Sequence, residues 1–152
     1  IIGADHRGFT LKEALKSWIA GQGHTVEDVS AATRDPADDY PDSGAAVGRA
    51  VAADPDARGI VLCGSGIGIA VAANKVAGVR AGTCATPEQV AAARADEDMN
   101  VLALSADALD APRAQTIVDA FLATPFSGAE RHVRRVGKIR AIEDSAHRSH
   151  TL

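Results

Sequence analysis

The chain has 152 residues, enough for one domain with a substantial hydrophobic core. Its formal charge of -4 argues against a general nucleic-acid-binding protein, which is usually basic, and no apolar run approaches the length of a membrane span. The two cysteines lack the spacing of a zinc site, and nothing else indicates a disulfide framework. We therefore expect a protein of the reducing cytoplasm, without nucleic-acid or membrane partners.

Five short apolar segments predict β-strands. In chain order they are residues 1–4, 25–29, 59–63, 79–84 and 101–104. Between them, the polar stretch 31–42 contains Pro36 and Pro41 and is interpreted as a loop.

Six further segments predict helices. In chain order they are residues 9–20, 44–53, 69–78, 87–98, 111–123 and 127–146. Asp42 or Ser43 is expected to cap the second helix, Thr86 the fourth and Asp110 the fifth. Ser127 is expected to start the last helix.

The alternation of strands and helices predicts the fold class. Such a chain forms an α/β, three-layer αβα sandwich with a parallel, Rossmann-like sheet, here of five strands. We expect a single domain over residues 1–146, including the C-terminal helix, and a tail over residues 147–152.

The stretch Cys63-Gly64-Ser65-Gly66-Ile67-Gly68 joins a buried strand to an alanine-rich helix. Such a loop offers backbone N–H groups and the positive end of a helix dipole at the sheet edge where α/β proteins bind ligands. The same environment favours the thiolate of Cys63, the nucleophilic and basic form. The dinucleotide fingerprint, the P-loop and the hydrolase elbow each lack a required residue here, so the loop suits a small anion or oxyanion better. The alternative is a glycine turn that holds an inert buried cysteine.

Other candidate residues follow predicted strands or lie on the last helix. Asp5 and His6 pair a carboxylate with an imidazole at a strand end, or are simply a loop cap and a surface histidine. Arg131 and Arg135 share one helical face and suit a phosphate, although a solvated basic face is the more common interpretation.

Several motifs occur together in one order and spacing: Gly3-Ala4-Asp5-His6-Arg7-Gly8, Asp39-Tyr40-Pro41, the Cys63 loop, Ala72-Ala73-Asn74-Lys75, Asn100-Val101-Leu102, and Arg131-His132 through Arg135. In these the chain resembles the ribose-5-phosphate isomerase B / galactose-6-phosphate isomerase family, from the first strand to the last helix. The resemblance implies an aldose–ketose isomerase that works through a cis-enediolate with neither metal nor organic cofactor. The default reaction converts ribose 5-phosphate to ribulose 5-phosphate.

The resemblance also implies roles for individual residues. Cys63 would be the base, Ser65 would hydrogen-bond its thiol, and Asp5 would move the hydroxyl protons. The remaining substrate-binding positions fall into two sets, the oxyanion-binding loop of Gly64, Gly66, Ile67 and Gly68 and the sugar-phosphate-binding side chains of His6, Tyr40, Asn100, Arg131 and Arg135. The family site is shared between two subunits, which implies a homodimer and leaves open whether dimers pair into tetramers. The region from Asp96 to Asn100, and the loop after the last strand, would come from the partner.

Two positions depart from the family pattern. Asp96 stands where the family has a ring-opening histidine, and Asp107 stands where it has a phosphate-binding arginine. Three hypotheses follow. Asp96 takes over ring opening; or the substrate is another sugar phosphate, such as a tetrose 4-phosphate, which cannot close a furanose ring; or the chain is a non-catalytic sugar-phosphate-binding homologue or a partner subunit.

Overall fold

A computed structural model describes residues 1–148, and the side-chain surroundings of residues 1–145. Four parallel strands form one sheet in the order β1-β2-β4-β3. Their bounds are Ile2–Ala4 for β1, Gly59–Cys63 for β2, Ala81–Thr83 for β3 and Val101–Ser105 for β4. The helices are α1 (Phe9–Gly21), α2 (Tyr40–Ala53), α3 (Ile67–Ala73), α4 (Pro87–Glu97), α5 (Ala111–Ala123) and α6 (Glu130–Arg148).

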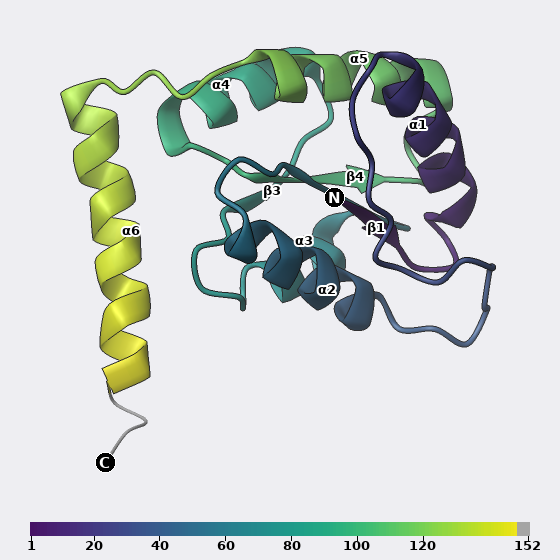
Figure 1. The fold of residues 1–152 in the computed structure, drawn as a ribbon, viewed down its shortest axis with the longest axis horizontal. Coiled ribbons are helices and arrows are strands. Elements are labelled where there is room, and N and C mark those ends of the chain that lie inside the picture. The colour runs from purple at the N-terminus through teal and green to yellow at the C-terminus, as the bar shows by residue number, and fades with distance from the viewer. Residues whose placement is uncertain (149–152) are drawn as a thin grey trace.

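Helices cover both faces of the sheet, which confirms the three-layer α/β architecture (Figure 1). Alternate residues of β2 point to opposite faces, as the pleat of a strand requires. Ile60 and Leu62 pack with α1, α4 and α5, whereas Val61 and Cys63 pack with α2 and α3. The strands are buried on both faces, which explains their continuous apolar sequence.

The prediction of a fifth strand at residues 25–29 is wrong. This segment forms only an isolated parallel bridge between Ile2 and Asp28, beside the three-residue strand β1. Asp28 is instead held by Lys12 and Lys16 of α1, so the chain turns toward the helix rather than continuing along the sheet.

The second helix begins four residues earlier than predicted, at Tyr40, with Asp39 as its N-cap residue. Pro41 lies in the first turn, where its missing N–H costs no hydrogen bond. Ser43 does not cap this helix; its hydroxyl donates to the Ala4 carbonyl (3.0 Å) and fastens α2 to β1. Thr86 and Asp110 cap α4 and α5 as predicted, each accepting a backbone N–H three residues on.

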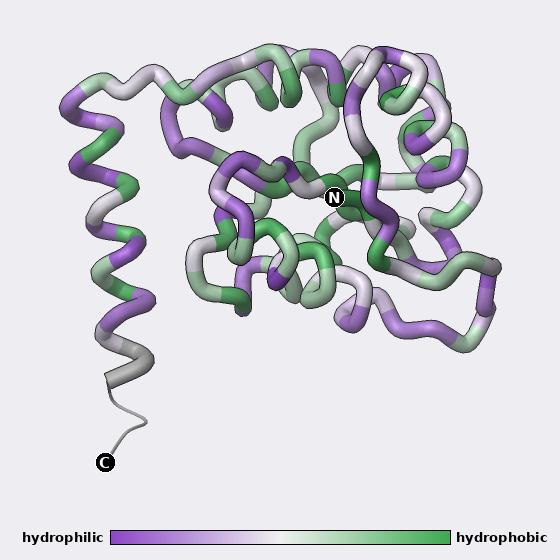
Figure 2. The backbone as a smooth tube through the Cα atoms, viewed as in Figure 1, coloured by the Kyte–Doolittle hydropathy of each residue, from purple (hydrophilic) through white to green (hydrophobic). Residues whose placement is uncertain are grey.

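Helix α6 lies along one side of the molecule (Figure 1), where it packs against α4 and its Glu143 accepts the Gly78 N–H at 3.0 Å. It begins at Glu130 rather than Ser127, whose hydroxyl accepts the N–H of Ala129. Apolar and polar residues alternate along it (Figure 2), and Ile142 is 68% exposed. The helix reaches Arg148, so most of the predicted 147–152 tail lies outside the described residues. Among residues 1–148, no helix has both the length and the apolar character needed to cross a membrane.

Candidate active site

Cys63 is the last residue of β2 and is 4% exposed. It pairs in register with Ser105 at the end of β4. Both strands are central, so the cysteine lies at the carboxyl edge of the sheet, where α/β folds bind ligands. Its sulfur accepts a hydrogen bond of 3.2 Å from the Gly66 N–H.

The glycines of the Cys63 loop allow close packing that side chains would prevent. A Cβ at position 66 would lie 2.8 Å from the Leu104 carbonyl carbon, and Gly66 has a left-handed φ of 75°. A Cβ at Gly68 would lie 2.8 Å from the ring of Tyr40, which brings that tyrosine against the loop. The loop therefore sits tightly between β4 and the start of α2, as a rigid support for the thiol.

The Ser65 hydroxyl accepts the Ile67 N–H at 3.2 Å. Within the described chain, the only hydrogen bond given to the Cys63 sulfur comes from Gly66, and the predicted Ser65–Cys63 bond is not formed. Two of the N–H groups that were expected to face an oxyanion, those of Gly66 and Ile67, are thus engaged inside the loop.

Asp5 and His6 follow β1, which is hydrogen-bonded to β2. The buried carboxylate of Asp5 accepts the N–H groups of Arg7 and Gly8, both at 3.0 Å on Oδ1. The His6 ring lies 2.6 Å from Asp38 through Nδ1, and the same carboxylate oxygen accepts the His6 N–H at 2.9 Å. Asp5 and His6 therefore lie at the same sheet edge as Cys63, in fixed orientations.

The loop after β4, which we expect the partner subunit to contribute, also lies against the Cys63 loop of its own chain. The Ala106 N–H donates to the Cys63 carbonyl (2.9 Å) and the Asp107 N–H donates to the Gly64 carbonyl (3.1 Å). The parallel pairing of β2 and β4 requires this, because the carboxyl ends of adjacent parallel strands share an edge. Asp107 forms an ion pair with Arg7, which crosses over Gly64.

Asp96 and Asn100 lie away from this edge. Asn100 precedes β4, and its amide side chain donates to the Gly78 carbonyl (2.9 Å) and accepts the Arg80 N–H (2.7 Å). Asp96, about half exposed, approaches Nδ1 of the buried His132 at 3.5 Å. Within one chain, Asn100 is therefore a structural residue at the amino edge of the sheet, and Asp96 faces α6.

Arg131 and Arg135 are exposed on α6, the helix that stands apart from the sheet (Figure 1). The structure of one chain brings together Asp5, His6, Tyr40 and the Cys63 loop, and leaves the two arginines on α6 and Asp96 on α4. Two hollows of about 350 and 290 Å³ lie elsewhere, along the Ile1–Arg58 edge and between Arg80 and Ile139. Neither hollow includes Cys63, which lies at the carboxyl ends of the central strands, the position of the crevice in which α/β folds bind ligands.

Three charged residues near the site were not singled out from the sequence. Arg7 directly follows the predicted site residues Asp5 and His6, and Asp38 lies in the acidic loop before Tyr40. The ion-pair partner of neither residue could be deduced from the local sequence. Lys12 is fully buried, and its ammonium donates to Asp28 (2.7 Å) and Ser30 (3.2 Å).

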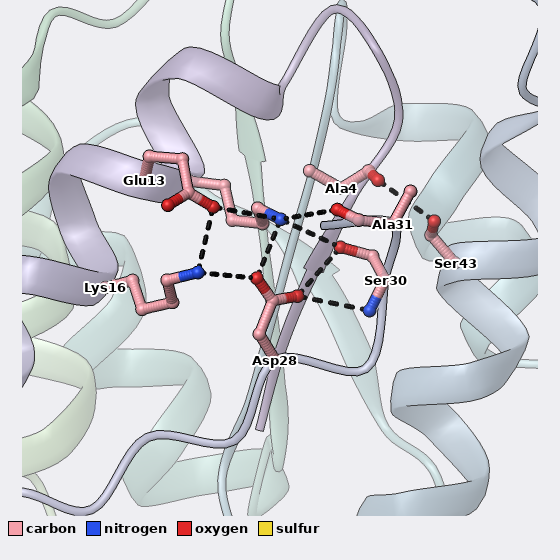
Figure 3. Close-up of polar contacts among 8 residues, drawn as sticks. Ala4, Glu13, Lys16, Asp28, Ser30, Ala31 and Ser43 are labelled. Atoms are coloured by element: carbon pink, nitrogen blue, oxygen red, sulfur yellow. Dashed lines mark hydrogen bonds and ion pairs between the residues drawn. The ribbon is translucent and has the colours of Figure 1, made fainter. Parts of the chain in front are cut away.

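The cluster around Asp28 also includes Lys16 and Glu13, and it ties α1 to the segment that leads toward Asp38 (Figure 3). Burial by itself would raise the pKa of Asp28, but hydrogen bonds from Lys12, Lys16 and Ser30 outweigh it and lower the pKa to about 2. Lys12, Glu13, Lys16 and Asp28 thus form an ionic anchor, which supports the loop next to His6.

Comparison with known proteins gives one consistent result. A family model described as Ribose/Galactose Isomerase matches residues 1–139. The chain is 39% identical to the ribose-5-phosphate isomerase B of Escherichia coli over 141 residues, which cover 93% of each chain.

Solved structures agree. The ribose-5-phosphate isomerase B of Clostridium thermocellum has a TM-score of 0.90 at 40% identity, covering 95% of this chain and 97% of that one. That of Mycoplasma genitalium, with bound ribulose-5-phosphate, has a TM-score of 0.90 at 38% identity and 94% coverage of both. With the fold, the Cys63 loop and these likenesses in agreement, the chain belongs to the ribose/galactose isomerase family.

Proposed function

We propose that this protein interconverts an aldose phosphate and its ketose phosphate, with ribose 5-phosphate and ribulose 5-phosphate as the default pair. The observation that carries the proposal is the placement of Cys63. It ends a central strand, lies in a glycine loop that holds its sulfur by a backbone N–H, and shares its sheet edge with Asp5 and His6. The Mycoplasma genitalium relative, of the same fold, was solved with bound ribulose-5-phosphate.

The isomerisation needs one base at carbon and one group that moves protons between two oxygens. The Cys63 thiolate takes the proton from C2 of the open-chain aldose, which leaves a cis-enediolate, and returns it to C1. Asp5 transfers the hydroxyl proton from O2 to O1. Both described bonds to Asp5 use Oδ1, which leaves Oδ2 for the sugar hydroxyls. No electron acceptor is required, because the oxidation at C2 balances the reduction at C1.

The enediolate oxygen needs hydrogen-bond donors that are already in place. The Gly66 N–H orients the base because it binds the Cys63 sulfur, and the Ile67 N–H is occupied by the Ser65 hydroxyl, so neither is directed at the substrate. The N–H groups of the other two loop glycines, Gly64 and Gly68, are the better donors to the oxyanion. Tyr40, packed against Gly68, would line the sugar side of the crevice.

We propose that two copies of the chain together form each phosphate-binding site. Arg131 and Arg135 lie on α6, which packs along one side of its own chain and leaves Val133 half-exposed and Ile142 exposed. On the body, the α3 residues Ile67 and Val71 are 61% and 55% exposed. A homodimer in which α6 packs across the partner would cover apolar surface on both and would bring a guanidinium pair to the partner's Cys63 loop.

A tetrose 4-phosphate is the second candidate substrate. A carboxylate at position 96, already engaged with His132, stands where a histidine would open a sugar ring. A tetrose 4-phosphate cannot form a furanose ring because its O4 carries the phosphate, so this substrate needs no ring opening.

A turnover panel with purified protein tests the proposal. It comprises ribose 5-phosphate, allose 6-phosphate, galactose 6-phosphate, erythrose 4-phosphate and free ribose. Turnover of ribose 5-phosphate is expected. Turnover of erythrose 4-phosphate alone would favour the second candidate, and no turnover of any sugar would contradict the isomerase and favour a binding or partner subunit.

A further inference from the structure

Arg7 bridges two loops at the mouth of the candidate site. Its backbone N–H is held by the Asp5 carboxylate, and its side chain crosses Gly64 and pairs with Asp107. A Cβ at position 64 would collide with the Arg7 guanidinium, so glycine is needed there for this course of the side chain. The guanidinium is thereby fixed above the residue that follows Cys63.

Most ion pairs between exposed side chains contribute little to stability, and this pair is 55% and 52% exposed. Its position is nevertheless unusual, because Arg7 follows Asp5 and His6 directly while Asp107 is bonded to the Cys63 loop through its backbone. A guanidinium has five N–H donors, and the described acceptor of the Arg7 side chain is the single carboxylate of Asp107. The remaining donors can bind a second anion.

We propose that Arg7 is a specificity-determining residue that binds the phosphate group of the substrate at the mouth of the Cys63 site, with Asp107 positioning its guanidinium. The inference deepens the proposed function and rests on it for the identity of the anion as a sugar phosphate.

The charges around the mouth support a guanidinium in this role. Asp5, Asp38 and Asp107 place three carboxylates near the crevice, and they would repel a phosphate dianion unless cations offset them. Asp38 holds the His6 ring and Asp107 holds the Arg7 guanidinium, so each side chain is fixed by its own carboxylate. Arg7 is the one of the two that is always charged and that can bind phosphate through two parallel N–H groups.

The test measures binding of inorganic phosphate, followed by the rise in melting temperature with phosphate concentration, and KM for the sugar phosphate that the wild type turns over. Three variants are compared with the wild type: Arg7→Ala, Asp107→Asn and Arg49→Ala. Arg49 is exposed on α2, and its removal controls for the loss of one positive charge.

Arg7→Ala is expected to weaken phosphate binding, and to raise KM, by about 10- to 100-fold, the effect of losing one or two charge-assisted hydrogen bonds. Arg49→Ala is expected to match the wild type. Asp107→Asn is expected to bind phosphate at least as tightly as the wild type, because the amide still accepts from Arg7 and no longer repels the dianion.

If the pair were only a structural contact, breaking it from either side would have the same effect. Equal weakening by Arg7→Ala and Asp107→Asn, or wild-type phosphate binding by Arg7→Ala, would overturn the inference. Because phosphate binding requires no turnover, its dependence on Arg7 would support this inference even if the isomerase activity failed. If Arg7→Ala turned over the sugar phosphate with the wild-type KM, the role of Arg7 would be contradicted while the isomerase activity would be confirmed.

Discussion

The backbone N–H of Gly66 donates a 3.2 Å hydrogen bond to the sulfur of Cys63. It can do so because residue 66 adopts a φ of 75° and passes within reach of the Leu104 backbone, a course that only glycine follows without strain. The Cys63 thiol and the turn that orients it are therefore one structural unit.

Gly66→Ala is expected to destabilise the protein more than Gly78→Ala. Both glycines have positive φ, but a Cβ at Gly78 meets open space, so that variant carries only the backbone strain, about 1 kcal/mol. The alanine at position 66 adds a collision with the Leu104 backbone, for a total of at least about 2 kcal/mol. Urea unfolding at one protein concentration measures both, and equal losses would contradict the packing described here.

The ionic anchor around Asp28 predicts a pH dependence of stability. The pKa of Asp28 is about 2 in the folded chain, against a reference value of 3.8. Since the folded pKa is the lower one, the ionised carboxylate stabilises the fold above pH ~4, and this contribution is lost as the pH falls toward ~2. We expect a loss of about 1 to 2 kcal/mol over that window.

Asp28→Asn is expected to be less stable than the wild type at neutral pH and to lack that part of the acid dependence. Asp119→Asn, at an exposed position of α5, is the matched control and should keep it. The measurement is the free energy of unfolding of the wild type and both variants from pH 2 to 7. An acid profile unchanged by Asp28→Asn would show that the cluster does not hold α1 to its neighbouring segment.

The proposed shared site predicts complementation between two inactive variants. Cys63→Ala lacks the proposed base, and the double variant Arg131→Ala/Arg135→Ala lacks the two side chains of α6 that are proposed to bind the phosphate. In a mixed dimer, one of the two sites receives Cys63 from one chain and both arginines from the other. After unfolding and refolding a 1:1 mixture, about a quarter of wild-type activity is expected, because half of the dimers are mixed and each has one intact site. No recovery would place all site residues in a single chain.

Asp96→His tests why the histidine of the family is absent. If the ring-opening step limits the use of ribose 5-phosphate, this change is expected to raise its turnover by about tenfold or more and to leave erythrose 4-phosphate unchanged. Steady-state kinetics on both sugars gives the answer. An Asp96→His variant that behaves as the wild type on both sugars would remove position 96 from the mechanism.

The sequence predicts the central part of this fold well, because buried parallel strands such as 59–63 and 101–104 are continuous β-branched and apolar runs. It also predicts the Cys63 loop and the capping by Thr86 and Asp110, which depend on neighbouring residues only. Prediction from the sequence fails where groups far apart along the chain determine the local structure. The segment at 25–29 leaves the sheet because Asp28 meets two lysines of α1, and α2 starts at Tyr40 because Pro41 fits a first turn as readily as a loop.

The same limit applies to the site. Arg7 and Asp107 are separated by 100 positions, and the pairing of β2 with both β1 and β4 brings the second beside the first. A carboxylate at position 107 suggests repulsion of phosphate when it is considered alone, whereas in the folded chain it holds a guanidinium. Asn100 is the opposite case. Its position next to a strand suggests a site residue, but in the folded chain its amide is hydrogen-bonded to the backbone of Gly78 and Arg80.

The central claim, that Cys63 abstracts the C2 proton, can be tested directly. The measurement is the loss of the C2–H signal of ribose 5-phosphate in D₂O, followed by ¹H NMR with the wild type, Cys63→Ala and Cys84→Ala. Cys84 is a buried thiol whose pKa is raised by burial, and it serves as the matched control. We predict that Cys63→Ala lowers the exchange and turnover rates by about 10²- to 10⁴-fold, while the rates of Cys84→Ala stay near those of the wild type. Undiminished exchange in a folded Cys63→Ala would contradict the assignment of Cys63 as the base.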